Sequence, residues 1–269
     1  MTITQKESDQ RSVKAAATKT APTKRVPMSS VRKTALVGGL FYVITFASSI
    51  PALFLLDPVL SDPNYILGPG ADGQVLLGLF LDLVNALACI GSAVALFSVV
   101  KRQHEGFALG FVTTRIFEAA VIIVGVLSLL SAVTLRQAGA AEGADASSLV
   151  TIGQALVATR DWTFLIGPSV MASLYAVLLG TLMYRSRLVP RVIPLLGLIG
   201  APLLLSWAIG TFFGISEGGT VWHLIGVAPI FVWELSLGIY LVVKGFRPSP
   251  ITPGFVDSGS PSTSQDVTA

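Results

Sequence analysis

Six long apolar runs, separated by shorter polar segments, dominate the chain from residue 34 onward. A bilayer core about 30 Å thick is crossed by an α-helix of about 20 apolar residues. Six runs reach that length, so we predict transmembrane helices over residues 34–56, 75–100, 107–135, 162–184, 192–214 and 222–243. A transmembrane barrel would need short alternating segments, which the sequence lacks. The predicted fold is therefore all-α, a polytopic membrane bundle of six helices that forms one domain over residues 34–247.

The segments outside these runs are two tails and one long loop. Residues 1–33 are basic with few large apolar side chains, and residues 248–269 are rich in Pro, Ser and Thr. Neither segment buries enough apolar surface to fold, so both are predicted to be disordered. In the loop of residues 136–161, apolar residues recur at helical spacing after Asp145. This predicts a short amphipathic helix that lies at the membrane interface or leads into the fourth span.

The distribution of Lys and Arg predicts the orientation in the membrane. Of the 18 basic residues, 15 fall in the N-terminal tail, the second and fourth loops and the C-terminal end. Positively charged segments stay in the cytoplasm, so both termini are predicted to be cytoplasmic. A cleaved signal peptide over the first run is an alternative, but this run exceeds the usual apolar length of about 7–15 residues.

Composition agrees with a membrane protein and narrows the chemistry. Hydrophobic residues make up 52% of the chain and charged residues 12%, against about 25% charged in soluble domains. The basic residues are scattered around apolar runs, which predicts a lipid bilayer as partner and no nucleic acid. Cys89 is the single cysteine, and the two histidines, His104 and His223, fall in different loops or span rims. No metal centre is expected from these residues.

No cofactor is expected either, because no motif in the sequence has the context that a cofactor site requires. The letters GxGxxG occur over residues 68–73, but they contain a proline and lie in a predicted loop. A dinucleotide site needs this motif between a strand and a helix.

Ionisable side chains inside the predicted spans are the candidates for function. On insertion scales an Asp or Arg at mid-helix costs roughly 2.5–3.5 kcal/mol, so such residues need a structural or functional reason. The candidates for ligand or proton binding are Asp82, Asn85, Arg115, Glu118 and Glu234, and a polar pair at the outer edge of the fourth span is formed by Arg160 and Asp161.

The spacing of these residues predicts that they are organised. Asp82 and Asn85, like Arg115 and Glu118, are three residues apart, so each pair shares one helix face. Arginine keeps its proton, and Arg115 is predicted to pair with Glu118, its nearest carboxylate in sequence. Asp82 and Glu234 are then left without a basic partner. If the faces converge, all of these groups form one polar ladder across the bilayer.

Two interpretations of this ladder remain open. In one, the polar groups satisfy each other and fix the register of the helices, with no ligand. In the other, they form a binding pocket or a proton relay. Intramembrane ionisable residues are functional candidates by default, but structural ion pairs use the same residue types.

At these residues the sequence resembles a bacterial membrane family, the domain of unknown function family DUF4386. The resemblance covers roughly residues 32–247 and rests on the segments Gln74–Gly78, Arg115–Glu118, Ala158–Trp162 and Tyr184–Arg191, with Asp82, Asn85, and the Glu234 span that ends in Lys244. It implies a six-helix domain in the bacterial cytoplasmic membrane, and it implies no activity.

Three functions are compatible with the sequence. The first is a small-molecule or proton-coupled permease, or a membrane ligand-binding protein, whose ligand is small and amphipathic or isoprenoid-like. The second is a cofactor-free intramembrane enzyme that acts on a lipid or isoprenoid by general acid chemistry. Trp207, Trp233 and Phe117 would line the pocket of such an enzyme. The third is a structural or regulatory membrane protein in which the charges lock the helices.

Overall fold

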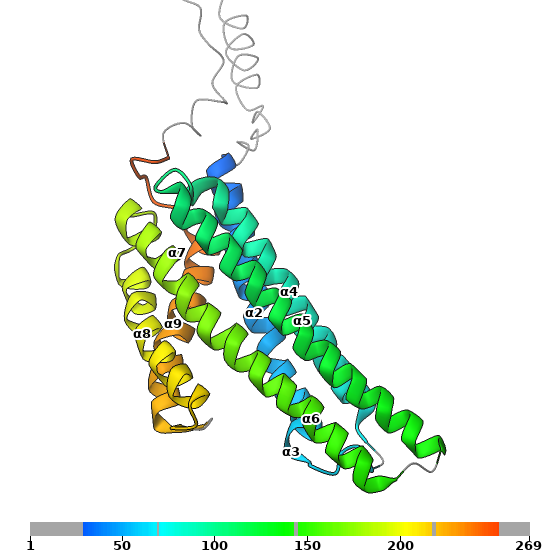
Figure 1. The fold of residues 1–269 in the computed structure, drawn as a ribbon. Coiled ribbons are helices and arrows are strands. Elements are labelled where there is room, and N and C mark those ends of the chain that lie inside the picture. The colour runs from blue at the N-terminus through cyan, green and yellow to red at the C-terminus, as the bar shows by residue number, and fades with distance from the viewer. Residues whose placement is uncertain (1–28, 69, 143–144, 217–218, 253–269) are drawn as a thin grey trace, which may run out of the picture.

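The computed structural model describes residues 29–68, 70–142, 145–216 and 219–252, and the regular elements in these ranges are helices (Figure 1). In chain order they are α2 (Ser30–Leu55), α3 (Asp57–Ser61), α4 (Asp72–Val100), α5 (Glu105–Glu142), α6 (Ala146–Phe164), the π-helix η1 (Leu165–Met171), α7 (Ala172–Ser186), α8 (Val192–Phe212) and α9 (Val221–Val243). Six helical stretches are long and apolar enough to span a membrane, with α6, η1 and α7 forming one of them. The prediction of an all-α bundle with six spans is confirmed, and the chain is a multi-pass membrane protein.

The fourth span differs most from its predicted bounds of 162–184. It runs without interruption over Ala146–Ser186, so the predicted amphipathic helix is the first part of this span. Asp145 caps its start by accepting a hydrogen bond from the Ser148 amide at 2.9 Å. Hydrogen bonds from Ser147 and Ser148 lower the pKa of Asp145 to about 2. Pro168 does not end the helix, because it lies in the wider π turns of η1, which accommodate a residue without an N–H donor.

Part of each predicted disordered tail belongs to the folded structure. The N-terminal helix starts at Ser30, because Ser29 caps it and Arg32 donates hydrogen bonds to the carbonyls of Leu241 and Val242 at the end of α9. At the other terminus, Ser249 is buried and donates to the carbonyl of Ser186. Residues 30–33 and 248–252 therefore belong to the folded part, and the rest of the predicted disordered tails lies outside the described residues.

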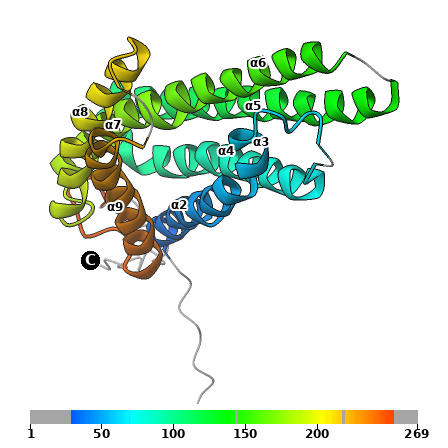
Figure 2. The same cartoon turned by 90° about the horizontal axis from the view of Figure 1, so that it is seen from below.

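The remaining spans match their predicted bounds closely, except at the end of α5. This helix continues to Glu142, seven residues beyond the predicted end at Leu135. Its 38 residues give a length of about 57 Å at 1.5 Å per residue. Helices α5 and α6 run side by side and extend beyond the other spans (Figure 2). The pair is longer than a bilayer core, so part of it projects from the membrane.

The helices pack as two groups joined by α7 and by the contact between α2 and α9. In one group α2 packs on α4, α4 on α5, and α5 on α6, while in the other α8 packs on α9. The chain termini of the described part and the loops of residues 101–104 and 187–191 gather at one end, which we call the basic end (Figure 1). The segments of residues 56–68 and 213–216 lie at the other end, which we call the far end. The prediction that the basic end faces the cytoplasm remains a prediction.

Glycines allow two of the helix contacts to be very close. A Cβ on Gly39 of α2 would lie 2.7 Å from the Cβ of Leu241 and 2.8 Å from the carbonyl oxygen of Gly238, both on α9. A Cβ on Gly226 would lie 2.8 Å from the Cα of Leu204 on α8. Small residues permit such backbone approach in membrane bundles. These contacts hold α9 against both α2 and α8.

The buried apolar side chains form two clusters: one, which includes Leu79 and Leu129, lies toward the far end, and the larger one extends to the basic end. The largest buried members of the larger cluster include Tyr42, Leu96, Tyr175, Met183 and Trp233. Many of the exposed side chains on the outer helix faces are large and apolar, such as Leu87 and Val94 on α4. Such surfaces suit contact with lipid. The other half of the bundle, toward the far end, contains the cavities described next.

Candidate functional site

A cavity of about 350 Å³ lies inside the bundle and is lined by residues of all six spans. Most of its lining is apolar, and its charged or amide side chains are Asp82, Asn85, Arg115, Arg160 and Glu234. The spans thus bring together five of the seven predicted site residues at one cavity, which we call the central cavity. The cavity is partly enclosed.

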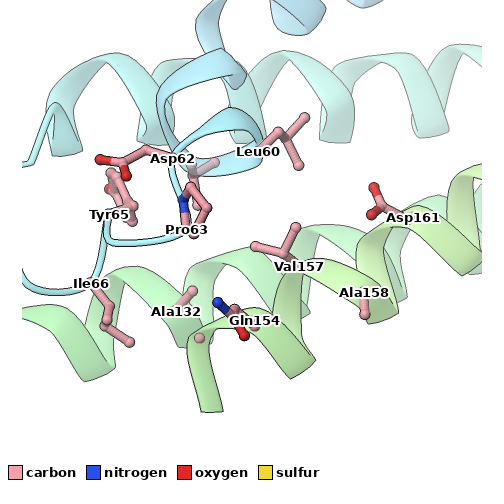
Figure 3. A pocket seen from close by; sticks show the side chains of 12 residues that line it. Leu60, Asp62, Pro63, Tyr65, Ile66, Ala132, Gln154, Val157, Ala158 and Asp161 are labelled. Carbon is pink, nitrogen blue, oxygen red and sulfur yellow. The ribbon is translucent and has the colours of Figure 1, made fainter. Parts of the chain in front are cut away.

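Two further cavities extend from the central cavity toward the far end. The first, of about 450 Å³, shares Leu53, Arg160, Phe164 and His223 with the central cavity and also contacts Asp161. The second, of about 260 Å³, again contacts Asp161 and is shown in Figure 3, where Asp62 and Asp161 lie on opposite sides of it. The three cavities therefore form a series with shared lining residues.

Arg115 and Glu118 form the first buried ion pair, as the sequence predicts. Arg115 Nη1 lies 2.8 Å from Glu118 Oε2, and both side chains are almost fully buried. The other terminal nitrogen of Arg115 donates to the Ser92 hydroxyl at 3.4 Å. The guanidinium carbon lies 4.3 Å from the ring centre of Tyr175 and 5.4 Å from that of Tyr42. Ion pairing and cation–π contacts together hold this arginine in place.

Asp82 and Arg160 form a second buried ion pair that the sequence did not predict. Arg160 Nη2 lies 2.8 Å from Asp82 Oδ2, and the pair joins α4 to α6. Arg160 lies 14 residues from the start of α6 with its side chain buried in the bundle, and its predicted place at the outer edge of the membrane stays a prediction. The prediction that two acids lack a basic partner is wrong, because Asp82 has one.

Glu234 is the remaining predicted carboxylate, and in the described part of the chain it has no hydrogen bond or ion pair. Its side chain is half-buried and contacts the central cavity. Phe231, three residues earlier on the same face of α9, contacts the cavity too and meets the ring of Phe46 edge-on at 5.0 Å between centres. By helical rise, Glu234 lies about 14 Å from the end of α9 at the basic end, near the middle of a bilayer core.

The other predicted residues lie in different surroundings. Asn85 contacts the central cavity, while Asp161 is exposed toward the two outer cavities. Of the three aromatic residues predicted to line a pocket, Trp207 contacts the cavity of about 450 Å³, and its ring centre lies 4.0 Å from that of His223. Trp233 is fully buried in the core, and Phe117 is exposed on the outside of α5.

A polar cluster at the far end was missed by the sequence analysis. Arg136 pairs with Asp72 and donates to the Gly68 carbonyl at 2.9 Å, and the Tyr65 hydroxyl donates to Asp72 at 2.9 Å. Burial and this hydrogen bond raise the pKa of Tyr65 to about 12. The cluster ties the segment before α4 to α5. Both Arg136 and Asp72 lay just outside the predicted spans, in two different loops. Their opposite charges at adjacent helix ends were the signal that could have indicated the pair.

The described part of the chain contains no group of three or more His, Cys, Asp or Glu side chains placed to hold a metal ion. Residues 37–245 match the profile of the family described as Domain of unknown function (DUF4386). The chain belongs to this family. No curated protein and no solved structure matches it. The matched region of this DUF4386 member includes both ion pairs, Glu234 and every residue that contacts the central cavity.

In this DUF4386 member the charged residues of the central cavity thus differ in whether they have a partner of opposite charge. Arg115 and Arg160 each have a carboxylate partner, while Glu234 faces the cavity with neither hydrogen bond nor ion pair among the described residues. An unpaired carboxylate inside a bilayer is costly, and it binds a proton or a positive charge readily. The arrangement is suited to reversible binding at Glu234.

Proposed function

We propose that this protein is a permease-like ligand-binding protein of the bacterial cytoplasmic membrane. It takes a small amphipathic molecule into the central cavity, where Glu234 binds the positive charge or the proton of the ligand. The observation that carries the proposal is the position of Glu234, which contacts a cavity lined by all six spans and has no partner among the described residues. With the termini in the cytoplasm, the cavity series leads from the outer side of the membrane to the site.

The one-sided arrangement of cavities supports a permease. The cavities lie between Glu234 and the far end, whereas the apolar core around Tyr42, Leu96 and Met183 lies between Glu234 and the basic end. A site near the midplane with access from one side at a time is the basis of alternating access. The fold described here then corresponds to the state open to the outside.

The two competing functions are less well supported. A general acid enzyme excludes water around its acid, and the central cavity is only partly enclosed. A purely structural lock accounts for Arg115 with Glu118 and for Asp82 with Arg160, but it gives no reason for Glu234. Two structural ion pairs beside a binding site at Glu234 agree with all of these contacts.

Access to the cavity is tested by thiol labelling, because Cys89 is the single native cysteine. In a Cys89→Ala background, Ser49→Cys places a thiol on the wall of the central cavity, and Leu87→Cys places one on the lipid-facing surface of α4. Membrane-impermeant methanethiosulfonates are then added to spheroplasts and to inverted vesicles, with labelling read by mass spectrometry. We expect Ser49→Cys to react from the outer side faster than Leu87→Cys, since thiols react as solvated thiolates.

Two results would contradict the proposed function. If Ser49→Cys in spheroplasts reacts no faster than Leu87→Cys, water-soluble molecules do not reach the cavity from outside. If it reacts only in inverted vesicles, the cavity opens to the cytoplasm and the proposed orientation is reversed.

A further inference from the structure

We infer that the ligand of the central cavity is an amphipathic organic cation whose ammonium group pairs with Glu234. The inference rests on the proposed function and adds the chemical class of the ligand. It follows from the charges, the aromatic rings and the size of the cavity.

The charges that remain available in the cavity are negative. Each arginine at the cavity has one terminal nitrogen 2.8 Å from a carboxylate oxygen, and its Nε atom is buried. An anionic ligand would have to compete with Glu118 or Asp82 for the positive charge of these guanidinium groups. A cationic ligand meets Glu234 without displacing anything. Breaking a buried ion pair costs several kcal/mol, so the cavity discriminates against anions.

Aromatic rings adjoin the free carboxylate. Phe46 and Phe231 contact each other edge-on and both contact the cavity, and Phe231 lies one helical turn from Glu234. Ring faces attract ammonium groups, most strongly where water is excluded. A carboxylate beside phenylalanine rings therefore favours an alkylammonium over a neutral ligand of the same shape.

The cavity suits an organic cation better than a metal ion. Ca²⁺ requires about 6–8 oxygen ligands, and Mg²⁺ requires near-ideal octahedral geometry. Glu234 is the one carboxylate at this cavity that lacks an arginine partner in the described structure, and the other side-chain oxygens of its lining are those of the paired Asp82, the Asn85 amide and hydroxyls such as that of Ser49. The volume of about 350 Å³ falls in the range of small-molecule pockets, and its lining is mostly apolar. A single positive charge on an apolar body fits both properties.

The two outer cavities are also lined by negatively charged residues. Asp161 contacts both of them and has no hydrogen bond or ion pair to any described residue, and Asp62 lies across the outermost cavity (Figure 3). Carboxylates along an entrance raise the local concentration of cations. A cationic ligand would thus pass Asp62 and Asp161 before it reaches Glu234.

The test compares three probes that share one apolar body: octylammonium, 1-octanol and octanoate. Binding to the purified full-length protein in nonionic detergent is measured by isothermal titration calorimetry. We expect octylammonium to bind most tightly and Glu234→Gln to weaken it by at least about 30-fold, the factor for about 2 kcal/mol on losing one partner of a buried charge pair. Glu234→Asp keeps the charge and is expected to retain the preference for octylammonium.

The controls separate the ligand class from the fold and from the proposed function. Unchanged gel filtration and a cooperative unfolding transition show that each variant is folded. Equal binding of 1-octanol and octylammonium, tighter binding of octanoate, or an unchanged preference in Glu234→Gln would each overturn the inference. In all three cases outside labelling of Ser49→Cys can still occur, so failure here is distinct from failure of the proposed function.

An ammonium group can belong to a free amine or to a lipid headgroup, and nanodiscs distinguish the two sources. Octylammonium binds equally in phosphatidylglycerol discs with and without phosphatidylethanolamine if the natural ligand is a free amine. Weaker binding in the presence of phosphatidylethanolamine identifies the ethanolamine headgroup as a competing occupant of the same site.

Discussion

Replacing Arg115 or Glu118 by glutamine is expected to lower the free energy of unfolding by about 3–5 kcal/mol. Both side chains are almost fully buried and are joined at 2.8 Å, so each replacement leaves one charge uncompensated inside the bundle. The loss of Arg115 also removes its cation–π contacts with Tyr42 and Tyr175. Glutamine keeps most of the shape and some hydrogen bonding, which separates the effect of charge from that of packing.

The measurement is denaturant unfolding in mixed detergent micelles, followed by circular dichroism. The matched control is Glu105→Gln, which removes an exposed carboxylate from the first turn of the same helix and should cost no more than about 1 kcal/mol. The double variant Arg115→Gln/Glu118→Gln should lose less than the sum of the single losses, since neither charge is then left alone. Additive losses, or single losses equal to that of Glu105→Gln, would show that the pair is not coupled.

A loss of similar size, about 3–5 kcal/mol, is expected from Asp82→Asn and from Arg160→Gln. The two residues form the ion pair that joins α4 to α6, and both are buried. Removing Asp82 leaves a guanidinium next to a partly enclosed cavity, where water relieves part of the cost. We therefore expect Asp82→Asn to be near the lower limit of the range.

The control for this pair is Asp161→Asn, the same chemical change at the residue next to Arg160. Asp161 is exposed and has no hydrogen bond or ion pair to any described residue, so its loss should change the free energy of unfolding by about 0.5 kcal/mol or less. A large loss in Asp161→Asn with none in Asp82→Asn would mean that Arg160 pairs with its sequence neighbour in solution.

The number and type of the spans could be predicted from the sequence because each apolar run is long enough to cross a bilayer by itself. The ends of the spans depend on partners that are distant in sequence. Arg32 extends α2 because it contacts carbonyls of α9 about 210 residues later. Pro168, which normally breaks a helix, is accommodated by π turns in the middle of a span. Neither effect leaves a local signal in the hydrophobic pattern.

The candidate site was predictable where its geometry is local. Arg115 and Glu118 are one helical turn apart, so their pairing follows from spacing alone. The pairing of Asp82 with Arg160 joins residues 78 positions apart and depends on how far α6 continues before Trp162. The isolation of Glu234 was predicted, since Arg115 pairs locally with Glu118, but the partner of Asp82 was not, so Glu234 could not be told apart from Asp82 by the sequence.

The most direct test of the central claim is the unfolding free energy of Glu234→Gln, measured without ligand beside the four variants of the ion pairs. The claim is that Glu234 serves a ligand and not the fold, so its charge is held inside the bundle at a cost to stability. We predict that Glu234→Gln is as stable as the wild type or more so. A loss of about 3–5 kcal/mol, like that expected for Glu118→Gln, would place Glu234 in the structural lock and contradict the account.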